Sequence, residues 1–208
     1  MAAYSLPPQA YINKFIPKNK FFEKALVHTK LKNEFVDQIQ KINWKYKLAE
    51  STIGITKTDQ VEEIQIFEIQ LRQKILPKNI LKLIDKAIPY PILYELVYDQ
   101  DIAYGISYKD GQNYNYYFSW WNPDIVFDIS GVNLQKVYEK LIAVFISPDQ
   151  ETSKDFQSLV SEDNQKKLLE KEIETLQNKL RKEKQFNRQV EINKILLQKK
   201  KELLQLTA

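Results

Sequence analysis

Acidic residues followed by a lysine lie along residues 61–72 and just beyond, and their types and spacing could support chemistry. Carboxylates on a strand can hold magnesium, and a nearby lysine can steady the attacking water of a two-metal nuclease. The spacing is loose, however, and the sequence identifies no matching acid on a neighbouring strand. Solvated positions on a half-exposed strand explain these residues more simply, so a metal-dependent nuclease is the alternative function. The residues concerned are Glu62, Glu63, Glu68, Gln70 and Lys74.

Other catalytic chemistries have less support. The 208 residues include no cysteine, which excludes disulfides, thiolate zinc sites and cysteine nucleophiles. A serine hydrolase would need the one histidine, His28, together with a nucleophilic serine in a Gly-x-Ser-x-Gly motif. The sequence contains no such motif, so we expect His28 to be a surface or core residue. The four glycines form neither a phosphate-binding loop nor a dinucleotide-binding loop. We therefore predict a protein that is not an enzyme, with no catalytic residue, no metal site and no cofactor.

A group of aromatic residues ends at Trp120 and Trp121. Aromatic rings interleaved with lysines can stack on nucleic-acid bases. Aromatic residues of strands belong more often to a core, and this is the simpler interpretation. The group also contains Tyr116, Tyr117 and Phe118.

Apolar spacing predicts the elements that must position these residues. Spacings of three and four predict helices, the first of them from Leu31, Phe35, Ile39, Ile42 and Tyr46. Short or alternating apolar runs predict strands. The predicted helices cover residues 30–48, 77–88 and 134–145. The predicted strands cover residues 51–55, 61–72, 92–98, 102–108 and 114–120.

The links between the last three strands are short, which forces antiparallel neighbours and predicts a meander. The strand at 61–72 would form a right-handed crossover with the strand at 92–98 if the two are parallel neighbours. Its apolar parity switches at Ile66 and Phe67, which a bulge or burial on both faces would explain. The predicted fold is α+β, with a mostly antiparallel sheet and flanking helices after an irregular lead of some twenty residues.

The C-terminal residues 163–206 contain no proline or glycine and predict a long, charged, coiled-coil-like helical arm. Apolar residues recur at multiples of seven, but the seam shifts near residues 183–188. The missing glycine and proline favour one rod, whereas the shift favours a helical hairpin. The predicted organisation is a globular body at 1–148, a polar linker at 149–162 and a helical arm at 163–208. The seam residues are Leu169, Leu176, Val190, Leu197 and Leu204.

The arm carries the positive charge of the chain. Residues 165–206 contain twelve Lys and Arg against six Glu, a net charge of +6, whereas the whole chain carries +4. This asymmetry predicts a nucleic-acid or acidic partner, with a merely solvated helix face as the competing interpretation. The predicted nucleic-acid contacts are Lys182, Lys184, Arg188, Lys199 and Lys200. The predicted partner contacts are Phe186, Asn187, Val190, Leu197 and Leu204.

The N-terminal residues lack the basic start and apolar run of a signal peptide. No apolar stretch approaches the roughly 18 residues that a membrane span requires. We therefore expect a cytoplasmic protein without a membrane partner.

Three of the most distinctive segments of the chain are FVDQIQKINWKYKL (35–48), EIQIFEIQL (63–71) and EKQFNRQVEIN (183–193). With several shorter segments they resemble one bacterial family, the domain of unknown function 4391. The resemblance extends over nearly the whole chain from about Ile16. The family has no established catalytic residues to carry over.

The resemblance implies a function by context. Members of this family look like accessory proteins encoded beside DNA methyltransferases and helicases in restriction-like phage-defence loci. It implies a subunit that bridges a helicase or methyltransferase partner, contacts DNA, or does both, and the arm would be its docking surface. A homodimer through the C-terminal helix and a stand-alone DNA-binding module are further interpretations.

Overall fold

The computed structural model describes residues 3–23, 28–110, 113–147 and 155–206. The chain divides into two compact units, residues 1–150 and residues 151–208. We refer to the first unit as the body and to its helical successor, residues 156–206, as the hairpin. Each unit is described by itself.

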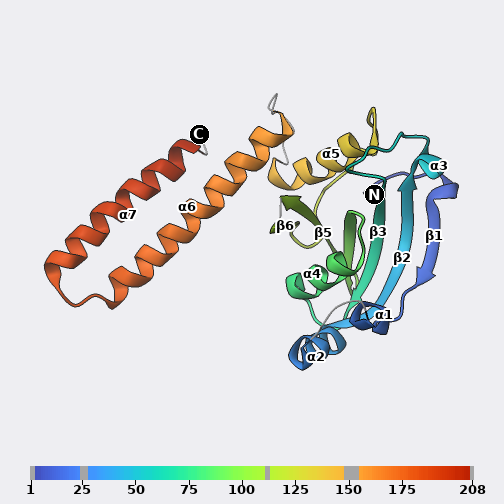
Figure 1. Ribbon diagram of the computed structural model, residues 1–208. Helices are drawn as coiled ribbons and strands as arrows, with labels where there is room; N and C mark the ends of the chain where they lie inside the picture. The colour runs from blue at the N-terminus through green and yellow to red at the C-terminus, as the bar shows by residue number, and fades with distance from the viewer. Residues whose placement is uncertain (1–2, 24–27, 111–112, 148–154, 207–208) are drawn as a thin grey trace. The chain divides into compact units, whose positions relative to one another are not determined.

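Six strands of the body form one sheet in the order β1-β2-β3-β4-β5-β6 (Figure 1). Neighbouring strands are antiparallel except β3 and β4, which are parallel and are connected through helix α4. The predicted α+β class, the mostly antiparallel sheet and the C-terminal meander of the body are therefore confirmed. The strands are β1 (Tyr11–Phe15), β2 (Ile39–Ala49), β3 (Glu63–Leu71), β4 (Ile92–Tyr98), β5 (Asp101–Asp110) and β6 (Asn113–Phe118).

Short helices flank this sheet in the described part of the body. A one-turn 3-10 helix, η1, precedes β1, and the helices at 78–87 and 134–146 lie close to the predicted positions. The elements are η1 (Pro8–Ala10), α1 (Asn19–Glu23), α2 (Thr29–Gln38), α3 (Glu50–Ile53), α4 (Lys78–Ala87) and α5 (Leu134–Ile146).

The main core lies between the sheet and helices α2 and α4. Phe67, Tyr94 and Leu81 are essentially inaccessible to solvent there. A Cβ at Gly105 of β5 would lie 3.0 Å from the ring of Phe118, so a larger residue there would require that ring to shift. Residues of the opposite parity on β3 are buried too, so this strand is covered on both faces.

A carboxylate inside this core fixes α4 to two strands. Asp85 of α4 accepts hydrogen bonds from the hydroxyls of Tyr94 (2.6 Å) and Tyr116 (2.5 Å). Burial raises the pKa of Asp85, and the hydrogen bonds from the two tyrosines act against that shift without cancelling it. The network is enclosed, so it stabilises the fold rather than presenting a reactive group.

The predicted helix at 30–48 is wrong in its second half, where the chain forms strand β2. Register shifts between Ile39 and Lys41 and between Trp44 and Tyr46 interrupt the ladder with β3. Because a bulge adds a residue and changes parity, Ile39 and Ile42 both reach the core although they are three residues apart. The bulged strand therefore places core residues three apart, which is the spacing that predicted a helix.

Two other local predictions are corrected. Residues 50–53 form the short helix α3 instead of a strand, and Gly54 ends this helix in the left-handed conformation (φ 70°). The hydroxyl of Thr52 also accepts a hydrogen bond from the N–H of Ala49. Residues 1–20, expected to be irregular, contain edge strand β1 with an irregularity at Asn13 (φ 48°).

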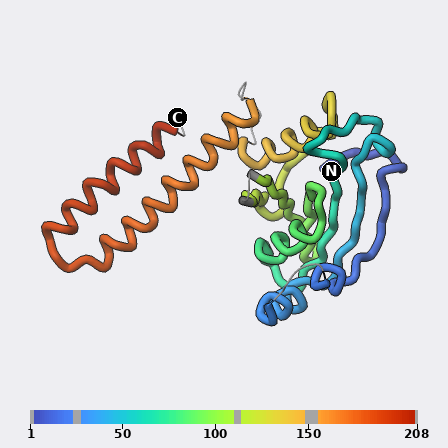
Figure 2. The backbone as a smooth tube through the Cα atoms, viewed as in Figure 1, coloured from blue at the N-terminus to red at the C-terminus, as the bar shows by residue number. Residues whose placement is uncertain are grey.

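The C-terminal unit is a helical hairpin of two antiparallel helices, as the tube in Figure 2 shows. Helix α6 (Phe156–Lys182) begins at the N-cap Asp155, whose carboxylate accepts from the N–H of Ser158 at 3.1 Å. Helix α7 (Phe186–Leu206) returns along it. The second half of the predicted linker is therefore helical, whereas its residues 149–154 lie outside the described part of the chain.

The bend between α6 and α7 needs neither glycine nor proline. The side chain of Glu183 accepts hydrogen bonds from the N–H groups of Lys184 (2.8 Å) and Gln185 (2.9 Å). The amide of Gln189 donates to the carbonyl of Glu183 at 2.7 Å. These bonds satisfy backbone groups that a helix end leaves open, so the chain turns in three residues. The hairpin, rather than the rod, is the observed form.

Candidate functional sites

Four polar residues form a row across neighbouring strands of the body sheet. Asn43 of β2 is the register partner of Glu68, which is the partner of Glu95 of β4, which in turn faces Tyr104 of β5. Direct register partners project on the same face of a sheet. The sheet therefore brings the two carboxylates together, although they are far apart in sequence.

Lys45 completes this group because it is the extra residue at the register shift between Trp44 and Tyr46. Its ammonium lies 2.6 Å from Glu95 and 3.2 Å from Glu68. We call Lys45, Glu68 and Glu95 the carboxylate–lysine cluster.

Neighbouring side chains complete the hydrogen bonding of the cluster. The hydroxyl of Tyr4 donates to Glu95. The amides of Asn43 and Gln70 each lie 3.4 Å from one oxygen of Glu68. The cluster is thus tied into the sheet and to the N-terminal segment.

The electrostatics of the cluster follow from partial burial. The side chain of Glu95 is 4% exposed, against 21% for Glu68 and 28% for Lys45. Burial by itself lowers the pKa of Lys45, but hydrogen bonding and charge from Glu95 and Glu68 outweigh it and raise that pKa. Burial and the nearby carboxylate of Glu95 raise the pKa of Tyr4 as well. The lysine therefore stays charged and balances one of the two acids.

Only some of the residues that the sequence suggested for a nuclease site lie in this cluster. Glu68 and Gln70 do lie in the group, but Lys74 does not supply its lysine. Lys74 binds Asp101 at 2.5 Å and covers the ring of Trp121 at 5.4 Å. The sequence reasoning missed Lys45 and Glu95. The signal that could have found Glu95 is its position as the one acid of the apolar strand β4.

The remaining nuclease candidates lie outside the cluster. Glu63 pairs with Lys47 at 2.7 Å, and Glu62 is exposed. Among the described residues, no group of three or more His, Cys, Asp or Glu side chains is arranged to hold a metal ion. A metal at Glu68 and Glu95 would therefore need amide oxygens such as those of Asn43 or Gln70, or water, to complete its shell.

Aromatic residues near the end of β6 divide between core and surface. Tyr116 and Tyr117 are buried, whereas Trp120 is 89% exposed. The core interpretation therefore holds for the two tyrosines and not for Trp120. His28 is exposed at the start of α2.

Helix α7 of the hairpin has two separate apolar faces. One face contains the half-buried Ile192 and the buried Leu196. Helix α6 packs against α7 and has its own buried residues Leu169 and Ile173. The other face of α7 contains Phe186, Val190, Leu197 and Leu204, which are 74%, 53%, 60% and 69% exposed. We call this second set the outer stripe.

The geometry of an α-helix separates the two faces. At about 100° per residue, the outer stripe lies within a sector of about 40°, and its centre is about 115° from that of Ile192 and Leu196 on the packed face. Four of the five predicted partner contacts form this stripe, and the fifth, Asn187, is exposed beside it. The structure thus brings the predicted partner contacts together on one surface.

The predicted nucleic-acid contacts are not equivalent. Lys182, Lys184, Arg188 and Lys200 are exposed. Lys199 lies across the hairpin from Glu172 at 3.0 Å and beside Glu202 at 3.1 Å. Lys199 therefore links α7 to α6, and a contact with phosphate would have to compete with two carboxylates.

The bend of the hairpin concentrates positive charge. Five basic residues lie within ten residues of sequence around the bend, and the same stretch contains a single acid, Glu183. Hydrogen bonds from the N–H groups of Gln185 and Lys184, together with the charge of Arg188, lower the pKa of Glu183. The cations are Lys179, Arg181, Lys182, Lys184 and Arg188.

The structure defines the class of this protein, and comparison with known proteins identifies its family. The body and the hairpin define an α+β protein with a helical appendage, and none of the described helices is long and apolar enough to cross a membrane. The chain belongs to the family described as Domain of unknown function (DUF4391), which it matches over residues 5–203. Neither a search of curated proteins nor a search of solved structures finds a match. The family resemblance predicted from sequence is confirmed.

Proposed function

We propose that this protein is a non-enzymatic accessory subunit of a cytoplasmic bacterial anti-phage complex of the restriction–modification kind. In this complex the hairpin docks on a helicase or DNA methyltransferase partner. The observation that carries the proposal is the outer stripe, an exposed apolar surface on a helix whose opposite side is already packed. Exposed apolar surface of this kind marks interaction sites.

The charge of the hairpin favours an acidic partner helix over a second copy. Residues 156–206 contain twelve Lys and Arg against eight Asp and Glu, a net charge of +4. Two copies would bring like charges together, whereas an acidic amphipathic helix would gain from the same charges. The spacing of Val190, Leu197 and Leu204 at sevens suits a partner helix packed in coiled-coil fashion.

Apolar anchors and charges have different roles in such a contact. Buried apolar side chains supply most of the docking energy, and charges at the rim steer and orient the partner. The anchors are the four residues of the outer stripe, Phe186, Val190, Leu197 and Leu204. Lys182, Lys184 and Arg188 contact acidic residues of the partner or phosphates of DNA.

Co-expression with the helicase and methyltransferase of the same locus tests this proposal. The Leu197→Asp variant should lose co-purification, with a cost of about 2 kcal/mol or more, roughly thirtyfold in affinity. Ile195→Asp is the matched control because Ile195 is 48% exposed but lies about 200° around the helix from Leu197. Equal co-purification of the wild type and Leu197→Asp would refute docking through the outer stripe.

A second measurement separates a partner from a second copy. Light scattering of the purified wild type should give a monomer. A dimer that Leu197→Asp converts to a monomer would assign the outer stripe to self-association and contradict the acidic partner.

The carboxylate–lysine cluster supports a second candidate function, metal-dependent cleavage of DNA. The specific observation is the adjacency of Glu68 and Glu95 in register, with Lys45 2.6 Å from Glu95. Two carboxylates can share a divalent cation, and a lysine beside them can orient water. The present ion pairs hold β2, β3 and β4 together, and this purely structural role competes with catalysis.

A cleavage assay distinguishes these roles. Labelled DNA is incubated with magnesium and the wild type, Glu68→Ala, Glu95→Gln or the control Glu63→Gln. Catalysis predicts magnesium-dependent products that both Glu68→Ala and Glu95→Gln abolish and that Glu63→Gln retains. No cleavage by the wild type, or cleavage that persists in Glu68→Ala, would refute the catalytic role of the cluster.

A further inference from the structure

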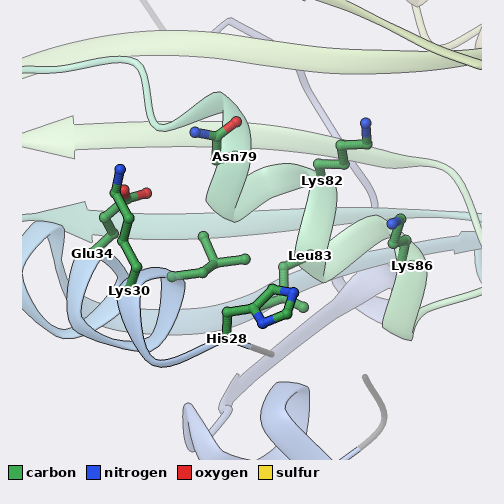
Figure 3. A pocket seen from close by; sticks show the side chains of 8 residues that line it. His28, Lys30, Glu34, Asn79, Lys82, Leu83 and Lys86 are labelled. Atoms are coloured by element: carbon green, nitrogen blue, oxygen red, sulfur yellow. The ribbon is translucent and has the colours of Figure 1, made fainter. Parts of the chain in front are cut away.

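A groove of about 500 Å³ lies between helices α2 and α4 of the body (Figure 3). Helix α2 contributes Lys30, Leu31 and Glu34, and His28 precedes it. Helix α4 contributes the other four side chains, which are Asn79, Lys82, Leu83 and Lys86. The groove belongs to neither the carboxylate–lysine cluster nor the hairpin.

The groove is positively charged. Three lysines line it against one acid, Glu34, so its net charge is +2 with His28 neutral. Within the described part of the chain, Lys30, Lys82 and Lys86 form no ion pair. Five other lysines of the body, by contrast, are paired with carboxylates: Lys45, Lys47, Lys74, Lys136 and Lys140.

Two of the groove lysines repel each other. Lys82 and Lys86 are four residues apart on α4 and therefore lie on the same side of the helix. Like charges at this spacing destabilise a helix by about 0.2–0.5 kcal/mol. Their arrangement lowers the stability of α4, but it gives an anion two adjacent cations.

We propose that this groove binds the phosphate backbone of a nucleic acid. Lysine ammonium groups are mobile point charges, and phosphate contacts need cations within reach rather than an exact spacing. Lys82 and Lys86 bind successive phosphates along α4, and the amide of Asn79 donates to a phosphate or sugar oxygen. Glu34 repels phosphate, so the strand follows the α4 side of the groove. In Figure 3 the labelled side chains of α4 line this side.

The lining chemistry argues for a polynucleotide over a small anionic ligand. A small anion is usually fixed by buried donors or by the fork of an arginine. The described lining contains no arginine, and its lysines are exposed. Recognition here depends on the number of phosphates rather than on the shape of one ligand. It also does not depend on docking through the hairpin.

The test measures binding of the full chain to a labelled DNA duplex and to a labelled single strand over a range of salt concentrations. The groove variant is Lys82→Ala/Lys86→Ala. It should bind about tenfold more weakly at low salt, and its log–log salt slope should fall by about two. The matched control is Lys57→Ala/Lys109→Ala, which removes the same charge from exposed lysines outside the groove.

A third variant separates the groove from the hairpin. Lys182→Ala/Lys184→Ala/Arg188→Ala removes cations near the bend and leaves the groove unchanged. Binding lost only in this variant would assign DNA to the hairpin and overturn the groove proposal without affecting partner docking. Co-purification in the docking experiment can in turn fail while the groove still binds DNA.

Other outcomes would also overturn the proposal. They are equal weakening in the groove variant and its matched control, no effect of the groove variant, or no binding by the wild type. Displacement of DNA by polyglutamate as effectively as by unlabelled DNA would assign the groove to an acidic protein. Circular dichroism of each variant establishes that it is folded.

Discussion

The body and the hairpin differ in how they hold their acidic side chains. In the body, Glu95 and Asp85 are buried and receive hydrogen bonds from Lys45 and Tyr116, which are far away in sequence. In the hairpin, most charges face solvent, and its cross-helix ion pair joins Lys199 to Glu172. The two buried acids of the body join its strands and a helix to one another. In the hairpin, the four apolar side chains of the outer stripe are exposed as well.

The two units also differ in how their contacts arise. The sheet of the body depends on pairings between strands separated by long stretches of chain, whereas the hairpin is one local connection between consecutive helices. Non-local pairing costs more loop-closure entropy, so it must be offset by an extensive core. We therefore expect a mutation in one unit to change the stability of that unit and not of the other.

The largest expected effect is a cavity in the body core. Phe67→Ala removes a ring that is 1% exposed and should lower the free energy of unfolding of the body by about 3–5 kcal/mol. Hydrogen exchange should accelerate in the sheet and stay unchanged in α6 and α7. Equal acceleration in the hairpin would show that the two units unfold as one.

Two neighbouring leucines of α7 should differ strongly in their contribution to the stability of the hairpin. Leu196→Ala removes a side chain that is 5% exposed and should destabilise the hairpin by about 2–5 kcal/mol. Leu197→Ala, at a 60% exposed position, should change stability by no more than about 0.5 kcal/mol. Exchange of the α7 amides measures both variants, and similar effects would contradict the division of α7 into two faces.

The buried carboxylate of the body gives a pH dependence. The pKa of Asp85 is raised above 3.8, so its stabilising contribution is complete below 3.8 and is lost as pH rises through the folded-state pKa. Asp85→Asn removes this loss. The unfolding free energy of the variant should therefore rise relative to the wild type between acidic and neutral pH. The rise should be about 1.4 kcal/mol for each pH unit that separates the folded-state pKa from the unfolded-state pKa.

Urea unfolding at several pH values measures this difference for Asp85→Asn. Any cost of the amide substitution that does not depend on pH displaces all points equally. A difference that stays constant with pH would contradict the raised pKa.

The smallest expected effect has the opposite sign and belongs to the hairpin. The pKa of Glu183 is lowered below 4.5, so its contribution is present above 4.5 and is lost as pH falls through the folded-state pKa. Acidification should accelerate fraying of the bend in the wild type and have less effect in Glu183→Gln. Exchange rates of the Lys184 and Gln185 amides, corrected for intrinsic pH dependence, test this prediction.

Local sequence patterns by themselves determined much of this protein. The α+β class, the strands at β3 to β6, helices α4 and α5, and the helical C-terminus follow from apolar spacing and turn residues. The family followed from several segments in combination. The outer stripe could also be predicted from the sequence, because Val190, Leu197 and Leu204 are seven residues apart and such spacing is visible within one segment.

Tertiary structure alone decided the rest. Residues 39–48, predicted as helix, form a bulged strand because pairing with β3 overrides the local apolar spacing. Tertiary structure placed Glu95 beside Glu68 and brought Lys45 to both, since register between distant strands cannot be read from one segment. It also closed the arm into a hairpin, because packing of one apolar face against another outweighs the local preference for a continuous helix.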